Sequence, residues 1–284
     1  MNRPVAWVTG AGGLIGNYLI QIAPEHAAGW TVVGLTRSRL DLTDFTAVRA
    51  AFAADQPQLV IHCAAISRST DCEAEPARAR QVNVDVTTRL SELATDIPFV
   101  FFSTDLVFDG RKGDYVETDL PNPLGIYAET KAVAEQAVMR NPRHTVVRTS
   151  LNGGTSPAGD RGFNEQIRAA WKPGRTPRLF TDEFRSPIAA RLTARAVWEL
   201  VARDQPGLYH IAGRERLSRW RIGRLLAERW PELNPHIAAA SLRDYSGAPR
   251  PPDTSLNCAK VQKLLSFPLP GLTEWLTAHP DEPF

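Results

Sequence analysis

The fold that this sequence predicts is decided by the run Thr9-Gly10-Ala11-Gly12-Gly13-Leu14-Ile15-Gly16. The run follows a short apolar stretch, Val5–Thr9, and a helical pattern continues from it to about residue 23. Its spacing is GxxGxxG: Gly10 suits a tight turn, Gly13 lets the backbone approach a pyrophosphate, and Gly16 lets a helix pack on a strand. A glycine-rich turn alone is weak evidence, but one that joins a predicted strand to a predicted helix predicts a dinucleotide-binding βαβ unit.

Strands and helices alternate through the first 150 residues. Apolar runs predict strands at residues 5–9, 31–36, 59–63, 99–103 and 145–149, and helical spacing predicts helices at 14–23, 45–54, 76–95 and 127–139. Near-continuous apolar strands that alternate with helices indicate a parallel sheet covered on both faces. The sequence therefore predicts an α/β fold, a Rossmann-type doubly wound parallel sheet, in a domain at residues 1–150.

The pattern loosens in the second half of the chain. Proline and glycine recur there between shorter helical stretches, so its elements are harder to place. We expect residues 151–284 to form a smaller substrate-binding lobe, parts of which interleave with the first domain.

The composition excludes several classes of protein. The chain has 284 residues, of which 43% are hydrophobic, so it can bury a core and is neither disordered nor fibrous. Its net charge of +2 includes no polybasic region that would bind nucleic acid or an anionic membrane. Three cysteines without CxxC spacing and six scattered histidines predict neither a disulfide framework nor a metal site. We expect neither a secretory leader nor a membrane-spanning segment, so the predicted compartment is the cytoplasm.

The residues after the second predicted strand indicate which cofactor is bound. An acidic residue at this point favours the free 2′-hydroxyl of NAD, whereas arginine accommodates the 2′-phosphate of NADP. This chain has Thr36-Arg37-Ser38-Arg39, with no acidic residue before Asp41. Two guanidinium groups around a serine suit a phosphate, so we expect NADP(H) to be preferred, with NAD(H) as the alternative. A solvated arginine pair in an arginine-rich chain is the competing interpretation.

Tyr127 and Lys131 stand one helical turn apart at the start of a predicted helix. A tyrosine with its ordinary pKa near 10 is a poor acid–base catalyst at neutral pH, and a neighbouring ammonium favours its phenolate. The fourth predicted strand ends in Ser103-Thr104-Asp105, which places hydroxyl groups at the carboxyl edge of the sheet, where ligands bind. The competing interpretations are a helix with one buried aromatic and one solvated lysine, and a serine–threonine turn.

Several motifs occur in the order known from one protein family and extend over nearly the whole chain. The glycine-rich turn, the stretch His62-Cys63-Ala64-Ala65-Ile66 and the YxxxK pair resemble the short-chain dehydrogenase/reductase superfamily. More narrowly, the chain resembles the dTDP-4-dehydrorhamnose reductase branch, whose extended members handle sugar nucleotides. That resemblance is carried by STDLVFDG (103–110), PNPLGIYAETKAVAEQ (121–136), VVRTS (146–150) and RPPDTSLN (250–257).

The resemblance implies a role for each matching residue. Tyr127 would protonate a carbonyl oxygen while NAD(P)H delivers hydride to the carbon, and Lys131 would hold the nicotinamide ribose and lower the pKa of the tyrosine. Thr104, or Ser103 in its place, would polarise the carbonyl. Asp41 and Leu42 would lie by the adenine. The further residues expected along the cofactor are Gly10, Gly12, Gly13, Leu14, Ile15, Gly16, Cys63, Ala64, Ala65, Thr149 and Ser150.

The substrate side departs from the branch. The branch usually has tyrosine where this chain has Leu106 and tryptophan where it has Leu151. Because those aromatic rings lie over the sugar in the family, we expect the same chemistry on a different substrate. The other candidate substrate contacts are Asp105, Arg68, Arg185 and Arg250, of which the last matches an arginine that contacts the diphosphate of sugar nucleotides. Solvated surface arginines are the competing interpretation.

The leading hypothesis is an NADP(H)-dependent oxidoreductase that reduces a ketone, in a 4-keto sugar nucleotide or a related small-molecule carbonyl compound. One alternative is a non-catalytic NADP(H)-binding regulatory subunit, because a relative in this branch serves methionine adenosyltransferase in that way. Another is an epimerase or dehydratase of the same superfamily. A homodimer is the family expectation, and no metal, nucleic acid or membrane partner is expected.

Overall fold

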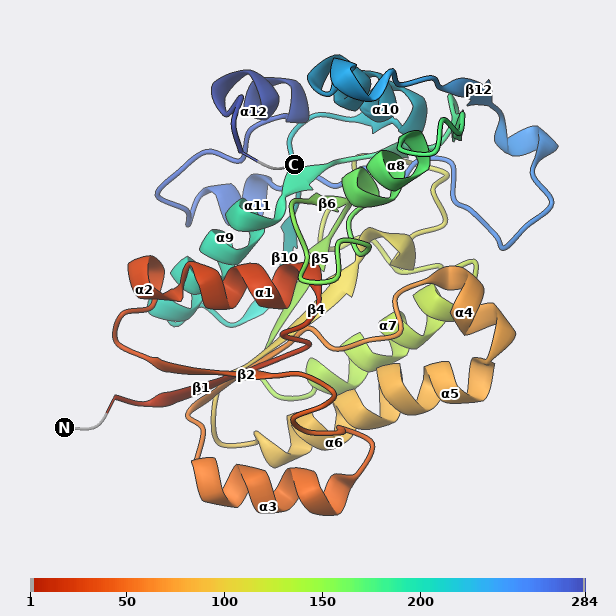
Figure 1. Ribbon diagram of the computed structural model, residues 1–284. Coiled ribbons are helices and arrows are strands. Elements are labelled where there is room, and N and C mark those ends of the chain that lie inside the picture. The colour runs from red at the N-terminus through yellow and green to blue at the C-terminus, as the bar shows by residue number, and fades with distance from the viewer. Residues whose placement is uncertain (1–2, 283) are drawn as a thin grey trace.

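Six parallel strands form the central sheet of the computed structural model, which describes residues 3–282 and 284. Their order across the sheet is β10-β5-β4-β3-β1-β2 (Figure 1). The fully buried positions of these strands carry mainly valine, isoleucine, leucine and phenylalanine, which suit a sheet covered on both faces. The predicted Rossmann-type α/β fold is therefore confirmed. The strand bounds are β1 Val5–Thr9, β2 Thr31–Leu35, β3 Leu59–His62, β4 Phe99–Thr104, β5 Thr145–Thr149 and β10 Gly207–Ile211.

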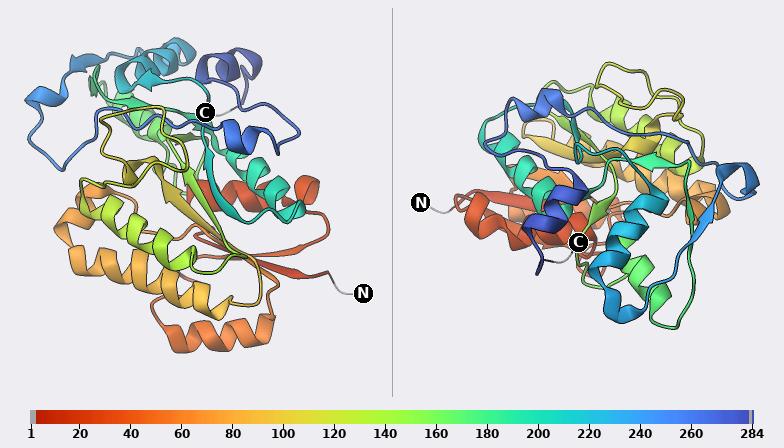
Figure 2. Two further views of the ribbon diagram at one scale, coloured as in Figure 1. Left: turned by 180° about the vertical axis from the view of Figure 1, so that it is seen from behind. Right: turned by 90° about the horizontal axis from the view of Figure 1, so that it is seen from above.

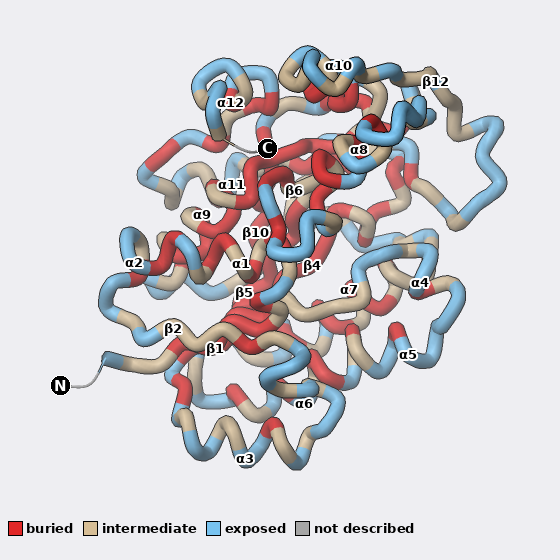
Figure 3. The backbone as a smooth tube through the Cα atoms, in the orientation of Figure 1, coloured by how far each residue is buried: buried red, intermediate tan, exposed pale blue. Residues whose placement is uncertain are grey.

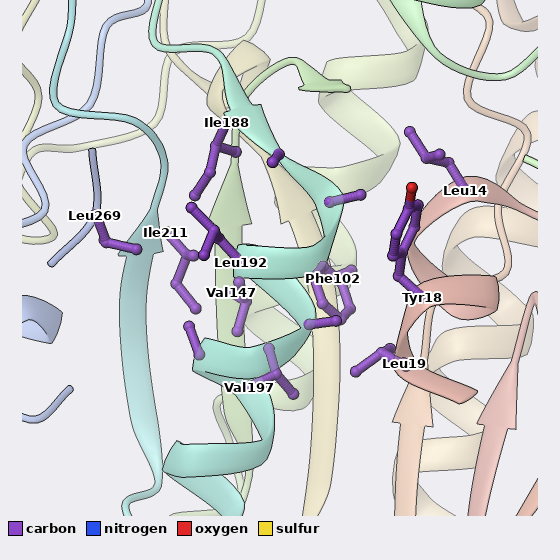
Figure 4. Close-up of a cluster of buried hydrophobic side chains, with 14 of the residues drawn as sticks. Leu14, Tyr18, Leu19, Phe102, Val147, Ile188, Leu192, Val197, Ile211 and Leu269 are labelled. Carbon is purple, nitrogen blue, oxygen red and sulfur yellow. The ribbon is translucent and has the colours of Figure 1, made fainter. Parts of the chain in front are cut away.

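Helices cover the two faces of the sheet in separate layers. Because side chains alternate along a strand, Ala6 and Val8 of β1 belong to one buried cluster and Trp7 belongs to another. The first cluster, part of which is drawn in Figure 4, includes side chains of α1 and α9, and the second includes side chains of α3, α6 and α7. Figure 3 shows the buried sheet between helices with exposed outer surfaces. These helices are α1 Leu14–Gln21, α9 Ala190–Ala202, α3 Phe45–Asp55, α6 Val86–Leu93 and α7 Ile126–Val138.

The helix expected at residues 76–95 is divided into three parts. Its first part is α5 (Pro76–Arg80), a π-helical segment (Gln81–Asp85) follows, and α6 completes it. A short helix, α4 (Ser69–Ala74), precedes α5 and contacts α7. This stretch therefore places the chain that follows β3 against the helix that follows β4.

The second half of the chain both completes the sheet and extends beyond it. Strand β10 pairs in parallel with β5, so the sheet contains residues from either side of position 150. The remaining elements gather beyond the carboxyl ends of the central strands (Figures 1 and 2). They are the helices α8 Phe163–Trp171, α10 Arg219–Arg229, α11 Ala259–Gln262 and α12 Leu272–Ala278, and the strand pairs β6 Asn152–Gly153 with β9 Ile188–Ala189, β7 Arg178–Phe180 with β12 Ala238–Ala240, and β8 Phe184–Arg185 with β11 Leu217–Ser218.

Within the described residues, no helix combines the length and the apolar character that crossing a membrane requires.

Candidate active site

A cavity of about 1010 Å³ lies at the carboxyl edge of the sheet. Strand β1 has β2 on one side and β3 on the other, so the strand order changes direction at this point. Ligands of open α/β sheets bind outside the strand ends at such a reversal. The cavity extends from the glycine-rich turn past the ends of β3, β4 and β5 to loops of the second half of the chain.

The glycine-rich turn forms one end of the cavity. Gly10 has a φ of +68°, and a Cβ atom there would lie 2.7 Å from the backbone nitrogen of Ala64. The N–H of Gly13 donates to the carbonyl of Gly10 at 2.8 Å, and α1 begins at the next residue. The residues of this turn and first helical turn that line the cavity are Gly10, Gly12, Gly13, Leu14, Ile15 and Gly16. Backbone N–H groups at a helix N-terminus that opens on a cavity fit the pyrophosphate of a dinucleotide.

A buried histidine holds the neighbouring strand end against this turn. The hydroxyl of Thr9 accepts hydrogen bonds from the backbone N–H groups of Cys63 and Ala64 at 3.2 and 3.3 Å. Burial lowers the pKa of His62 to about 3, so the ring is neutral, and its Nδ1 lies 2.7 Å from the hydroxyl oxygen of Thr9. The segment fixed in this way contributes Cys63, Ala64 and Ala65, three of the residues expected along the cofactor, to the cavity.

The end of β2 contributes only part of the expected arginine pair. Arg37, Asp41 and Leu42 line the cavity, whereas Ser38 and Arg39 do not. Arg39 donates to the carbonyl of Gly34 at 3.3 Å, away from the cavity. The guanidinium of Arg37 lies 3.9 Å from the carboxylate of Asp41, and its side chain is 78% exposed. Arg37 is therefore the guanidinium that this structure makes available to a ribose phosphate.

The expected catalytic side chains meet at the centre of the cavity. Thr104 at the end of β4, Tyr127 and Lys131 in the first turns of α7, and Ser103, Thr149 and Ser150 all line it. The Thr104 hydroxyl donates to the carboxylate of the next residue at 3.2 Å and accepts the N–H of the residue after that. Among the described residues, the buried Ser103 hydroxyl has no hydrogen-bond partner. A ligand atom in the cavity would give that hydroxyl a partner.

Burial dominates the proton affinities of Tyr127 and Lys131. It raises the pKa of Tyr127 well above its ordinary value, and the carboxylate of Asp105 adds to the rise, whereas the hydrogen bond with Thr104 opposes it. The net direction is opposite to the lowering that the sequence led us to expect from Lys131. Burial also lowers the pKa of Lys131 to about 7, against the effect of Glu135. At neutral pH, therefore, Tyr127 keeps its proton and Lys131 is partly charged.

Arginines of the second half of the chain form the opposite wall. Arg185, Arg219 and Arg250 line the cavity around Glu183, whose side chain is 2% exposed. Arg250 donates twice to the Glu183 carboxylate, at 2.7 and 3.0 Å, and Arg185 and Arg219 lie 3.6 and 3.7 Å from it. Burial alone would raise the pKa of Glu183, but the three guanidinium groups hold it below its ordinary value. One buried carboxylate thus keeps three cations together at the cavity.

Asp105 lies behind this wall and outside the cavity lining. Its carboxylate is fully buried and accepts two hydrogen bonds from Arg185, at 2.6 and 2.7 Å. The hydroxyls of Ser150 and Thr254 donate to it at 2.6 and 3.2 Å. The sequence suggested Asp105 as a direct substrate contact. In the structure it orients Arg185, which does line the cavity.

The residues that depart from the branch are part of the same cavity. Leu106 and Leu151 both line it, as does Arg68. Arg68 forms an ion pair with Asp160 at 3.0 Å, and Asp160 also pairs with Arg161, a further lining residue, at 3.1 Å. The two leucines that stand where the resemblance led us to expect aromatic residues therefore both line the cavity.

Several residues of the substrate side were not predicted from the sequence. Glu183, Arg219, Arg161 and Tyr245 line the cavity but belong to no motif that the sequence made visible. The nearest available signal was Arg185, a predicted substrate contact, because Glu183 stands two positions before it. Within the described part of the chain, no group of three or more histidine, cysteine, aspartate or glutamate side chains has the arrangement of a metal site.

The cavity has a strong excess of positive charge. Seven arginines and Lys131 line it, against the two acidic side chains of Asp41 and Glu183, which gives a formal charge of +6. The whole chain has a net charge of +2, so the rest of the molecule is net negative. A concave surface of one sign concentrates ligands of the opposite sign, so this cavity suits polyanions.

Comparisons with known proteins agree with this architecture. Residues 6–282 match the family described as RmlD substrate binding domain. A probable low-salt glycan biosynthesis reductase, Agl14, of Haloferax volcanii is 31% identical, with 96% of each chain covered. Methionine adenosyltransferase 2 subunit beta of Xenopus laevis is 27% identical over 91% of this chain and 82% of its own. The structure of a Bacillus anthracis dTDP-4-dehydrorhamnose reductase in complex with NADP has a TM-score of 0.88 at 22% identity, with 98% of each chain covered.

The family match extends over nearly the whole chain, and the resemblance that the motifs predicted is confirmed. The chain belongs to the RmlD substrate-binding-domain family, and with it to the NAD(P)-dependent oxidoreductases of the extended short-chain dehydrogenase/reductase type.

Proposed function

We propose that this protein uses NADP(H) to reduce a ketone in an anionic substrate, and that a 4-keto sugar nucleotide is the substrate class. The observation that carries the proposal is the composition of one continuous cavity. A glycine-rich cradle lies at one end, Thr104, Tyr127 and Lys131 lie in the middle, and an arginine wall lies at the other end. A dinucleotide and a nucleotide-linked sugar are both polyanions, which the formal charge of +6 favours.

The catalytic side chains support reduction with Tyr127 as the acid. Its raised pKa keeps the phenol protonated at neutral pH, so it can donate its proton to a carbonyl oxygen. The hydroxyls of Thr104 and Ser103 are the donors that would polarise that carbonyl, and Lys131 would hold a cofactor hydroxyl beside Tyr127. A bound nicotinamide cofactor supplies the hydride that adds to the carbonyl carbon.

Arg37 supports NADP(H) over NAD(H). No acidic residue precedes Asp41 at the end of β2, and the Arg37 guanidinium has only a long contact of 3.9 Å with that carboxylate. An exposed guanidinium with one weak partner can bind a 2′-phosphate in bidentate fashion. The reductase from Bacillus anthracis, which shares this fold, was solved with NADP.

Leu106 and Leu151 support a substrate other than dTDP-4-dehydrorhamnose. Both line the cavity, so the loss of the family's aromatic rings changes its surface directly. Aliphatic side chains lack the flat face that stacks on a sugar ring, and they leave a differently shaped space. Efficient reduction of dTDP-4-dehydrorhamnose by the purified protein would contradict this part of the proposal.

A non-catalytic regulatory subunit is the second candidate function. It is favoured by the similarity to methionine adenosyltransferase 2 subunit beta, which covers 91% of this chain. Turnover separates the two candidates. An enzyme consumes NADPH with its substrate, whereas a regulatory subunit binds NADPH without turnover.

The decisive experiment is to follow NADPH absorbance with a panel of 4-keto sugars linked to dTDP, UDP or GDP. We expect one NADPH to be consumed per ketone reduced with at least one member of the panel. The Tyr127→Phe variant should lose about 10²- to 10⁴-fold in kcat while it retains NADPH binding. Tyr209→Phe, on strand β10 outside the cavity lining, is the matched control. Product formation without net NADPH consumption would instead indicate an epimerase or dehydratase.

A further inference from the structure

Helix α7, which carries Tyr127, begins without a capping side chain of its own. Its N-cap residue is Gly125, and the first N–H groups of a helix have no partner within the helix. The N–H of Ile126, the first residue of α7, donates instead to Oε1 of Glu73 at 2.8 Å. Glu73 belongs to α4, 53 positions earlier in the chain. The helix that carries the proposed acid is therefore capped by a carboxylate from another helix.

Gly125 has the size that this cap requires. Its φ of −139° is an extended conformation that any residue adopts, so the backbone does not demand glycine here. A Cβ atom at this position would lie 2.9 Å from Oε1 of Glu73, closer than carbon and oxygen normally approach. Chain neighbours aside, no other heavy atom of the described residues lies within 4 Å of that point. The carboxylate therefore occupies the space that a side chain at position 125 would need.

The N–H group that Glu73 caps belongs to the residue immediately before Tyr127. Tyr127 follows Ile126 directly, and Glu73 and Tyr127 both line a second, small cavity of about 20 Å³. A negative charge at a helix N-terminus is favourable, because it opposes the partial positive charge of the unpaired N–H groups. The carbonyl of Tyr127 is held separately, since the buried hydroxyl of Thr130 donates to it at 2.7 Å. The first turn of α7 is thus fixed at both its N–H and its carbonyl groups.

We propose that Glu73 is a positioning residue for Tyr127, a role that rests on the function proposed above. Its carboxylate sets the start of α7 and so the place of the phenol relative to the hydroxyl of Thr104. Gly125 is its structural counterpart, because any larger residue would displace the carboxylate. A small misplacement of a catalytic group lowers turnover far more than it lowers ligand binding.

Four variants test this role: Glu73→Ala, Glu73→Gln, Gly125→Ala and the double variant Glu73→Ala/Gly125→Ala. With the best substrate of the 4-keto sugar panel, Glu73→Ala should lower kcat about tenfold and leave the dissociation constant of NADPH nearly unchanged. Glu73→Gln should retain most of the activity, because its amide oxygen accepts the same hydrogen bond from Ile126. Glu92→Ala, which removes an exposed carboxylate from α6, is the control for loss of charge.

The double variant distinguishes this cap from a general loss of stability. Gly125→Ala should lower kcat about tenfold when Glu73 is present and have little further effect once Glu73 is alanine, because the obstructing carboxylate is gone. An equal loss in both backgrounds would overturn the matched role of the two residues. A Glu73→Gln variant as impaired as Glu73→Ala would overturn the role of the hydrogen bond.

Amide hydrogen exchange at Ile126, measured by NMR, gives a readout that needs no substrate. Exchange should be faster in Glu73→Ala and close to the parent rate in Glu73→Gln, because only the alanine variant removes the acceptor. Unchanged exchange in Glu73→Ala would overturn the cap itself. If the parent protein turns over no member of the panel, the proposed function fails, and the catalytic part of this proposal fails with it, whatever the exchange shows.

Discussion

The two ends of the cavity are built from different parts of the chain and by different physical means. At the cofactor end, the surface is mainly backbone and small side chains from the glycine-rich turn and the end of β3. At the substrate end, long charged side chains from separate loops surround Glu183. The first surface follows directly from how β1 and α1 are joined. The second exists only after distant segments have met.

This difference indicates what each end depends on. Backbone donors need only the correct conformation of a few consecutive residues, so a single glycine with a positive φ is critical for the cofactor end. Clustered guanidinium groups repel one another and stay together only because buried carboxylates compensate their charge. The substrate end should therefore be sensitive to the loss of a counter-ion, even of one that never contacts the ligand.

The largest expected effect comes from removing such a counter-ion. Asp105→Ala leaves Arg185 buried without the carboxylate that now accepts two hydrogen bonds from it. Breaking a buried pair on one side costs about 3–5 kcal/mol, so the free energy of unfolding should fall by that amount. Urea denaturation measures the change.

An exposed ion pair provides the comparison for Asp105. Glu274 pairs with Arg214 at 2.6 Å, but both side chains are more than half exposed. Glu274→Ala should change the free energy of unfolding by at most about 1 kcal/mol. If Asp105→Ala were no more harmful than Glu274→Ala, the substrate end would not depend on its buried carboxylates.

At the cofactor end, most of the residues that the sequence grouped together do line one cavity. The strand, the turn and the helix at residues 5–21 are consecutive, so the glycine spacing and the apolar run together define the local geometry. Tyr127 and Lys131 were found for the same reason, because a spacing of four within one helix is a local property.

The residues of the substrate end could not be predicted from local sequence patterns. Glu183 and Arg219 come together through the pairing of β8 with β11. These strands are two residues long, which is too short to give a recognisable pattern in the sequence. Arg37 and Arg39 are two positions apart, yet only one faces the cavity, because the turn after β2 directs Arg39 to the carbonyl of Gly34. Burial also reversed the expected shift of the Tyr127 pKa, and burial is a property of the folded chain.

A matched pair of glycines tests the dependence of the cofactor end on backbone conformation. Gly10 has a φ of +68° and lies against the backbone of Ala64, whereas a Cβ atom at Gly12 would come no closer than 3.8 Å to the nearest atom, a methyl group of Thr36. Gly10→Ala adds at least about 1–2 kcal/mol of backbone strain and should weaken NADPH binding tenfold or more. Gly12→Ala should bind NADPH within a few-fold of the parent protein. Fluorescence titration with NADPH measures both, and equal losses would contradict the assignment of roles in the turn.

The arginines after β2 give a second matched pair with a smaller expected effect. Arg37→Ala should lower the preference for NADPH over NADH by about tenfold, since a hydrogen bond to a charged group contributes about 1.5–3 kcal/mol and this one is exposed. Arg39→Ala should leave the preference unchanged, because its guanidinium binds the carbonyl of Gly34. The ratio of kcat/KM for the two cofactors measures the preference. An unchanged ratio in Arg37→Ala would remove the basis for expecting NADP(H).

The smallest expected effect is a pH dependence of cofactor binding through Lys131, which lies between the two ends of the cavity. Burial places its pKa at about 7, and the negative charge of a cofactor bound in the same cavity would raise that value. The free protein then loses this proton near pH 7 and the bound protein loses it at higher pH, so binding takes up a proton between the two values. The affinity for NADPH should therefore fall a few-fold as the pH rises from 7 to 9. Lys131→Met should bind more weakly at pH 7 and show a flat profile over the same range, whereas a slope that persists in this variant would assign the proton to another group.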